Sequence, residues 1–294
     1  METLSEQSGS LMEASIIFES YLPDALRRAL DYAGDEGFVA SLPQLLHARA
    51  NAPYDNVIWN TWFSANTEET VCKTPAGNNV MVTVHGGGVF ASPERFESVY
   101  RSNVNRSNPE GYTGEYAAKI SVREARDVLR GTLSGEEIPV YPFDEFKRGM
   151  RDQPRRYAVV MDFETARNST SGYVPFDDLR DEPLMIVRAG GVEAAVAYLD
   201  KARDRHNTTV MGNWHPYKRI NPDLPQTRVL FLTGNRDGVG TEDDDDEIYG
   251  YDADSGLGGE ACIHNTSMIN VARYVAVAPR DASTSVRDLP FSVA

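Results

Sequence analysis

Four short apolar runs in the second half of the chain constrain its fold most strongly. They read YAVVMD at 157–162, LMIVRA at 184–189, RVLFL at 228–232 and RYVAVA at 273–278. Their length, their content of β-branched and aromatic residues and the glycine or charged residues that bound them favour buried β-strands. We therefore predict a sheet of roughly five to seven strands at the centre of the fold.

Further strands are predicted before these runs. ETVCKT and VMVTVH flank the turn signal PAGNN, so Glu69 to His85 is expected to form a hairpin, and NVIWNTWF is also rich in strand-forming residues. Helices are predicted between the strands. SVREARDVLRG, for example, has a capping box of Ser121 with Glu124 and a glycine stop at Gly131. Helices that connect strands in this way indicate some parallel pairing.

The first 55 residues have a helical pattern. SLMEASIIFESYL is predicted as a helix, Pro23 starts a second helix, and Ser41 caps a third. Residues 1–55 are thus expected to be a helical N-terminal section and residues 56–294 a mixed α/β domain, joined as one continuous unit. The predicted fold class is α+β or α/β, with the helical N-terminal section packed on a mixed, partly parallel β-sheet.

Composition excludes several classes of protein. Hydrophobic residues make up 41% and charged residues 25%, which is ordinary for a globular chain and argues against wholesale disorder. We expect no membrane span, because there is no run of about eighteen apolar residues. The N-terminus lacks a basic leader region, and Cys72 and Cys262 lie far apart without a CxxC motif, so a cytoplasmic location with reduced thiols is predicted.

Negative charge is concentrated in one segment. The net charge is -15, and ten acidic residues with no lysine or arginine fall between Asp237 and Glu260, which we call the acidic segment. This excess of negative charge argues against nucleic acid as a partner. Its candidate ligands for Ca²⁺ or Mg²⁺ are Asp252, Asp254 and Glu260, since both ions take carboxylate oxygens. Their spacing is not that of an EF-hand loop, and a solvated loop without metal remains the alternative.

A glycine-rich corner is the second candidate site. VMVTVH is followed by Gly86, Gly87 and Gly88, and Ser92 with Pro93 then starts a helix. Glycines can turn several backbone N–H groups toward one point, and a helix N-terminus adds free donors, so the corner could hold a phosphate. Neither the G-x-G-x-x-G nor the Walker pattern is present. The alternative is a tight turn beside a buried His85.

Two local resemblances bear on this corner. His85 and the three glycines resemble the HGGG loop of the hormone-sensitive-lipase branch of α/β-hydrolases, which implies an oxyanion hole. That family also needs a G-x-S-x-G elbow, and this sequence has none. The corner also resembles the glycine-rich loop of macrodomain-type ADP-ribose glycohydrolases, which implies a catalytic role for Glu97. The tandem glutamine-glutamate signature is missing, because Phe96 precedes Glu97.

These features lead to two hypotheses of function. In the first, an enzyme-like domain binds a phosphate-bearing small molecule, of nucleotide type, at Gly86–Ser92. If it is catalytic it is a hydrolase or transferase with His85, Glu97 or Asp162 as acid or base. The alternative is a non-enzymatic binding or assembly protein that docks a partner through an acidic, Ca²⁺-binding segment. The sequence leaves open whether the chain is an enzyme, and it leaves the oligomeric state open.

Overall fold

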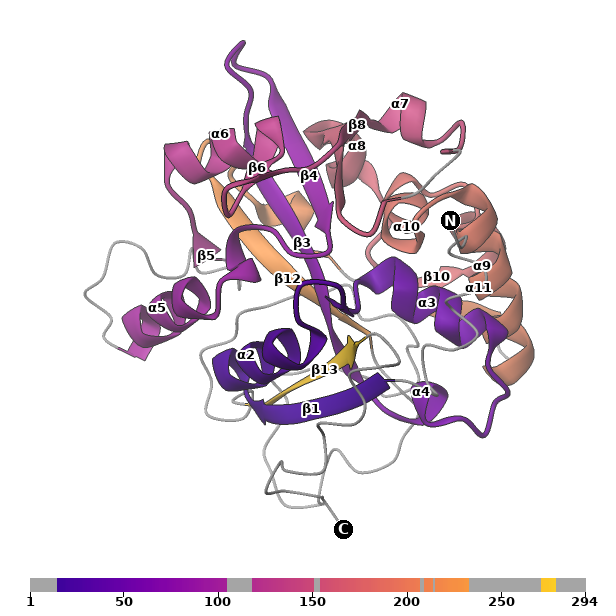
Figure 1. Ribbon diagram of the computed structural model, residues 1–294. Helices are drawn as coiled ribbons and strands as arrows, with labels where there is room; N and C mark the ends of the chain where they lie inside the picture. Colours follow the sequence, from indigo (N-terminus) through magenta and orange to yellow (C-terminus); the bar gives the residue numbers. More distant parts are fainter. Residues whose placement is uncertain are drawn as a thin grey trace.

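The computed structural model describes residues 15–104, 118–150, 154–206, 209–213, 215–232 and 271–278. Its centre is a six-stranded sheet with a mixed strand order (Figure 1). The strands, from one edge to the other, are β5 (Ala118–Lys119), β12 (Gln226–Leu232), β3 (Phe63–Lys73), β4 (Asn79–His85), β9 (Tyr157–Asp162) and β8 (Val140–Pro142). All neighbours are antiparallel except β8 and β9, which are parallel. The predicted mixed, partly parallel sheet is confirmed.

A second sheet joins regions from the two ends of the chain. It has the order β1 (Ser15–Tyr21), β13 (Val271–Val277) and β2 (Phe38–Val39). Strands β1 and β13 pair over seven positions, from Ser15 with Val277 to Tyr21 with Val271. Two small two-stranded sheets, β6 (Thr132–Leu133) with β7 (Glu136–Glu137) and β10 (Gly172–Pro175) with β11 (Val210–Asn213), complete the strands.

Helices are spread along the whole described chain and are not gathered at its N-terminus. The α-helices are α2 (Leu22–Ala33), α3 (Leu42–Asn51), α4 (Val57–Asn60), α5 (Pro93–Val104), α6 (Val122–Arg130), α7 (Phe143–Phe146), α8 (Phe163–Asn168), α9 (Phe176–Leu179), α10 (Pro183–Ala189) and α11 (Val192–His206). Two short 3₁₀ turns, η1 (Val89–Ala91) and η2 (Tyr217–Arg219), lie between them. The fold is therefore of the α+β class. No helix in these ranges is long and apolar enough to cross a membrane.

The central sheet is covered on both faces (Figure 1). Helix α6 lies over one face, where Ala125 and Val128 pack with Val82 and Val84 of β4. Helices α8 and α10 cover the other face, where a second core cluster joins their side chains to β3, β4 and β9. Charged side chains in the central strands are consequently enclosed by protein on both sides.

Local signals placed several elements correctly. The Glu69–His85 hairpin is confirmed by β3 and β4, which pair from Thr67 with His85 to Lys73 with Asn79. Helix α6 begins with the expected capping box, in which the Ser121 hydroxyl accepts the N–H of Glu124. It ends at Gly131, whose left-handed φ of 72° favours glycine.

Three local predictions were wrong. Ser15–Tyr21 is a strand and not part of a helix, because it pairs with β13 from the opposite end of the chain. The run LMIVRA forms helix α10 and not a strand. Every residue from Leu184 to Ala189 is buried, so its sequence shows no helical periodicity, and only Pro183 at its start and Gly190 at its end mark it as a helix. Val57–Asn60, expected in a strand, is a helical turn capped by Asn56.

Candidate functional site

The glycine corner follows β4 and leads into η1 and α5. Gly86 and Gly87 have φ values of 86° and 100°, which side chains rarely adopt. The N–H groups of both glycines donate to the carbonyl oxygen of Asn66 on β3, over 2.8 and 3.1 Å. The first two amides of the predicted anion site are thus already bonded inside the protein.

The next three amides bind a carboxylate from the chain itself. The N–H groups of Gly88, Val89 and Phe90 donate to the two oxygens of Glu68 over 2.8–2.9 Å. Glu68 is 2% exposed and lies on β3, where it pairs with Val84 of β4. A Cβ atom added at Gly88 would lie 2.6 Å from a Glu68 oxygen, so the close approach requires glycine there. The corner does hold an anion, but that anion is an internal side chain.

Burial raises the pKa of Glu68 to about 7, against the three backbone N–H groups and Arg156, which favour the ionised form. Arg156 itself is held close by, since its Nε donates to the carbonyl oxygen of Gly87 over 3.0 Å and it pairs with Glu136. Glu68 and Arg156 thus both form hydrogen bonds with the backbone of the turn.

His85 is enclosed and fully bonded. It is 0% exposed, its Nε2 lies 3.1 Å from the carbonyl oxygen of Val187, and its Nδ1 lies 3.2 Å from the Thr67 hydroxyl. The Thr67 hydroxyl also accepts the N–H of Leu42 over 2.9 Å. Since a carbonyl can only accept, Nε2 carries the proton and Nδ1 accepts from Thr67. Burial lowers the pKa of His85 to about 4, so the ring is neutral and ties β3 and β4 to α3 and α10.

The other predicted site residues lie at separate places. Ser92 caps α5, where its hydroxyl accepts the N–H of Arg95. Glu97 lies further along α5, 3.6 Å from Arg27. Asp162 caps α8 and accepts the N–H groups of Glu164 and Thr165.

Strand register separates two of these acid or base candidates. Asp162 on β9 pairs with Val80 near the start of β4, whereas His85 is the last residue of β4 and pairs with Tyr157. The two lie roughly 17 Å apart along the strand direction. The three candidate metal ligands Asp252, Asp254 and Glu260 fall outside the described residues. Within the described ranges, no three or more His, Cys, Asp or Glu side chains are grouped to hold a metal ion.

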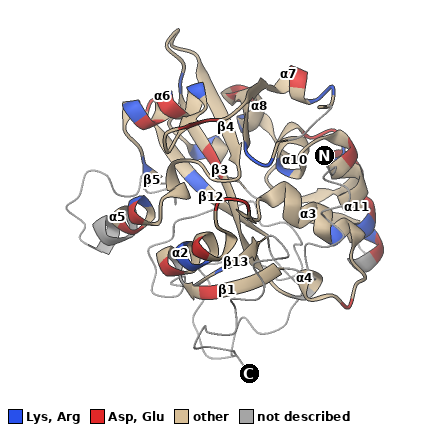
Figure 2. Ribbon diagram, viewed as in Figure 1, with Lys and Arg blue, Asp and Glu red and all other residues tan. Residues whose placement is uncertain are grey.

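A buried ion pair lies on the opposite face of β3, and the sequence analysis missed it. Arg188 of α10 binds Glu69 through two hydrogen bonds, of 2.8 and 2.9 Å, and also donates to the Asn213 side chain over 2.7 Å. The Tyr217 hydroxyl donates to the same carboxylate. Figure 2 shows such charged positions within the central strands. The only signal in the sequence was the polar stretch NTEET inside a strand with apolar neighbours.

Strands β12 and β13 each place a residue against residues 61–63. Leu232, the last residue of β12, pairs with Phe63. Near the start of β13, the Arg273 guanidinium bonds the Thr61 hydroxyl, lies 4.9 Å from the centre of the Trp62 ring and pairs with Glu19. Leu232 and Arg273, which lie in the chain on either side of residues 233–270 and of the acidic segment, thus both contact residues 61–63.

Comparison with known proteins identifies the fold. No family model and no curated protein matches the sequence. This chain is similar to a solved structure described as "Accommodation of massive sequence variation in Nanoarchaeota by the C-type lectin fold". The TM-score is 0.61 and the sequence identity is 23%. The similarity covers 90% of this chain and 97% of that one. At this identity the likeness establishes a C-type lectin fold and does not establish a ligand.

This likeness contradicts the predicted enzyme-like domain with a phosphate-bearing ligand at the glycine corner. The physical reason is on β3, where Asn66 and Glu68 already bond the amides that such a ligand would need. The anion-binding and hydrolase or transferase hypotheses lose their support. The alternative, a non-enzymatic binding or assembly protein, agrees better with a C-type lectin fold.

Proposed function

We propose that this chain is a non-enzymatic binding protein whose C-type lectin scaffold presents residues 233–270 to a partner. The observation that carries the proposal is that Leu232 and Arg273, on either side of this stretch in the chain, both contact residues 61–63. Connections between strands of a rigid scaffold commonly carry the binding residues of a protein.

The scaffold is well suited to hold such a segment. Strand β12 pairs with β3 along most of its length, and β13 pairs with both β1 and β2. Arg273, near the start of β13, bonds Thr61 and Glu19, and its guanidinium lies against the Trp62 ring. The C-type lectin fold of the similar structure is described as accommodating massive sequence variation. We infer that residues 233–270 are where this chain tolerates change.

The charge of the segment indicates the class of partner. Ten acidic residues and no basic ones lie between Asp237 and Glu260, so the partner we propose is a protein with a basic surface. Asp252, Asp254 and Glu260 are proposed to bind Ca²⁺, with Mg²⁺ the alternative, because hard oxygen ligands suit both ions. A cytoplasmic location stays a prediction.

The first experiment measures fluorescence anisotropy of a labelled octalysine peptide with the full chain. Changing Asp243, Asp244, Asp245 and Asp246 together to asparagine should weaken binding by about tenfold or more, because four contacts between opposite charges are lost. A matched control neutralises four exposed acids of the scaffold that form no ion pair with described residues. These are Asp31, Asp35, Glu36 and Asp178. Equal losses in both variants would show that net charge alone attracts the peptide, which contradicts the proposal.

The second experiment tests the metal by calorimetric titration with Ca²⁺ and, separately, Mg²⁺. Binding of one Ca²⁺ that is lost in D252N/D254N/E260Q but kept in the scaffold control supports the site. The absence of heat with either ion would contradict it. A glycan array, screened with and without Ca²⁺, distinguishes a carbohydrate ligand from the basic protein partner proposed here.

A further inference from the structure

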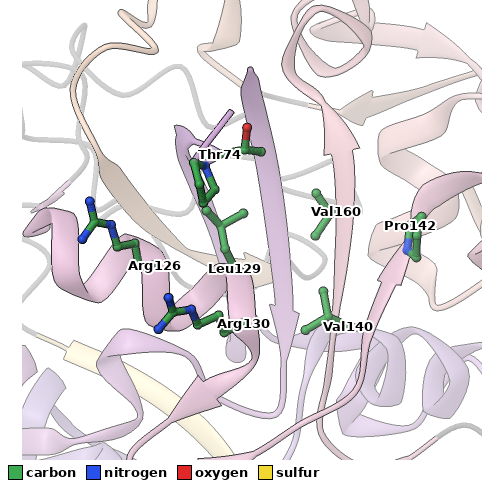
Figure 3. Close-up of a pocket in the computed structure, with 8 residues that line it drawn as sticks. Thr74, Arg126, Leu129, Arg130, Val140, Pro142 and Val160 are labelled. Carbon is green, nitrogen blue, oxygen red and sulfur yellow. The ribbon is translucent and has the colours of Figure 1, made fainter. Parts of the chain in front are cut away.

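A surface groove of about 400 Å³ lies between α6 and the strands β8 and β9 (Figure 3). Its floor is apolar and is formed by Leu129, Val140 and Val160, which are partly buried and pack on the core beneath α6. Arg126 and Arg130 stand along the α6 side, and Pro142 lies on the β8 side (Figure 3). The groove is therefore mostly apolar, with the two arginines bordering it on the α6 side and Thr74 and Pro75 also lining it.

The two arginines of this groove have no acidic partner among the described residues. Both acidic side chains of α6 are engaged elsewhere: Glu124 binds Arg95 over 2.7 Å, and Asp127 faces Arg123 at 3.8 Å. Arg126 and Arg130 are exposed. They are spaced i, i+4 on one helix face, so their Cβ atoms lie roughly 6 Å apart. Their charges are thus available to an incoming anion.

We propose that this groove binds an extended acidic segment of a partner protein, with Asp or Glu at alternate positions and an apolar residue between them. Alternate residues of an extended chain are roughly 6.6 Å apart and point to the same side, which matches the spacing of the two arginines. The residue between them points to the opposite side, toward Val140 and Pro142. Each guanidinium can bind a carboxylate through two parallel hydrogen bonds.

The shape of the groove favours a peptide over a small molecule. Small ligands usually lose most of their surface to the protein, whereas Arg126, Arg130 and Pro142 are exposed along this rim. The net charge of -15 opposes a nucleic acid and also the distant approach of an acidic peptide. At about 0.15 M salt the screening length is about 8 Å, so recognition there depends on contacts inside the groove.

The test uses the full chain and a fluorescein-labelled Gly-Ser-Glu-Val-Glu-Ser-Gly peptide, measured by anisotropy at about 0.15 M salt. R126A/R130A should bind at least about tenfold more weakly than wild type, because both guanidinium contacts are lost. The control R123A/K147A removes the same charge from exposed positions outside the groove and should bind within about twofold of wild type. Equal losses in the two variants overturn the proposal.

A charge exchange gives a readout that misfolding cannot imitate. R126E/R130E should reject the Glu-Val-Glu peptide and gain affinity for a Lys-Val-Lys peptide of the same length. V140D keeps both arginines and should weaken the binding of the Glu-Val-Glu peptide. If R126E/R130E fails to gain affinity for the lysine peptide although its thermal unfolding matches wild type, the proposal is wrong.

Two further measurements identify other occupants. Competition by inorganic phosphate as effective as that by unlabelled peptide would assign the groove to small anions. Sedimentation of the wild-type chain as a dimer that R126A/R130A converts to a monomer would assign it to a second copy. Either result overturns the peptide proposal, whereas weak phosphate competition and an unchanged sedimentation coefficient support it.

Discussion

The two faces of β3 stabilise neighbouring carboxylates in different ways. Glu68 and Glu69 are 2% and 1% exposed and point to opposite sides of the sheet. Glu68 accepts three backbone N–H groups of the glycine corner. Glu69 binds the Arg188 guanidinium and the Tyr217 hydroxyl. One face therefore binds a carboxylate with backbone dipoles, and the other binds it with a full positive charge.

The difference appears in their pKa values. Burial raises the pKa of Glu68 to about 7, because the amides only partly replace the lost water. Burial acts on Glu69 in the same direction, but Arg188 and Tyr217 hold its pKa below the ordinary value. Residues adjacent in sequence thus differ in protonation near neutral pH. The contrast shows why an amide-rich corner need not bind an external anion. The Glu68 carboxylate already binds these amides, and its charge changes with pH near neutrality.

Removing the positive partner of Glu69 should have the largest effect. R188M is expected to lower the free energy of unfolding by about 3–5 kcal/mol, since it leaves a buried carboxylate without its counter-charge. R203M is the matched control, because Arg203 pairs with Asp177 at the surface, and it should cost less than about 1 kcal/mol. Urea denaturation measures both. Equal losses of unfolding free energy would mean that the buried Arg188–Glu69 pair contributes no more than a surface ion pair.

The second prediction concerns pH and the Glu68 face. A folded pKa of about 7 lies above the ordinary value of 4.5, so Glu68 contributes stability that is present below pH 4.5 and lost as pH rises to about 7. The slope is about 1.4 kcal/mol per pH unit at most, and the total is on the order of 3 kcal/mol. E68Q cannot ionise and should lack this slope.

The measurement is the free energy of unfolding of wild type and E68Q from pH 4.5 to 8, taken as a difference. Burial lowers the pKa of His85 and His215 to about 4, so both contribute stability that is lost as the solution becomes more acidic. Subtracting E68Q removes their share. A wild-type advantage that shrinks toward pH 7 supports the contrast between the two faces. A constant or growing advantage would mean that the amides hold Glu68 ionised throughout.

Sequence reasoning recovered elements whose causes are local. The turn signal between β3 and β4, the Ser121 capping box and the Gly131 stop each depend on residues within a few positions. It failed where the local structure depends on contacts with residues that are far away in the sequence. Ser15–Tyr21 is a strand only because β13 lies beside it, and α10 is buried on all sides, so its apolar run carries no period. The mixed sheet was predictable, and the C-type lectin fold was not.

The candidate site failed for a related reason. Three glycines after a strand indicated a tight turn, but the external anion predicted there is wrong. Gly86 and Gly87 donate to the Asn66 carbonyl oxygen, and the next three amides bind the carboxylate of Glu68. The identity of that anion depended on which side of β3 Glu68 faces across the hairpin, and no pattern near residue 87 records it. Likewise, Arg188 stands 119 positions from Glu69, so their pairing could not be read from either sequence neighbourhood.

The smallest predicted effect compares hydroxyl groups on the two faces. Thr67 shares the Glu69 face and links Leu42 N–H to His85, whereas Thr70 shares the Glu68 face and donates to Thr227 over 2.9 Å. Both threonines are 0% exposed. T67V leaves a buried N–H and a buried ring nitrogen unsatisfied, while T70V removes one bond between hydroxyls. T67V should therefore cost about 1 kcal/mol more than T70V in urea denaturation.

The threonine pair also separates this bonding pattern from a general effect of packing. Valine has nearly the shape of threonine, so both substitutions keep the volume of the strand, and a difference between them reflects hydrogen bonds. In T67V the His85 ring loses the donor to Nδ1 but keeps Val187 as acceptor for Nε2. Its NMR signals should shift, while T70V leaves them unchanged. Equal unfolding free energies of the two variants, with unchanged His85 signals, would contradict this prediction. The Thr67 hydroxyl would then not link β3 to α3, and the Glu69 face of β3 would depend on the Arg188–Glu69 ion pair alone.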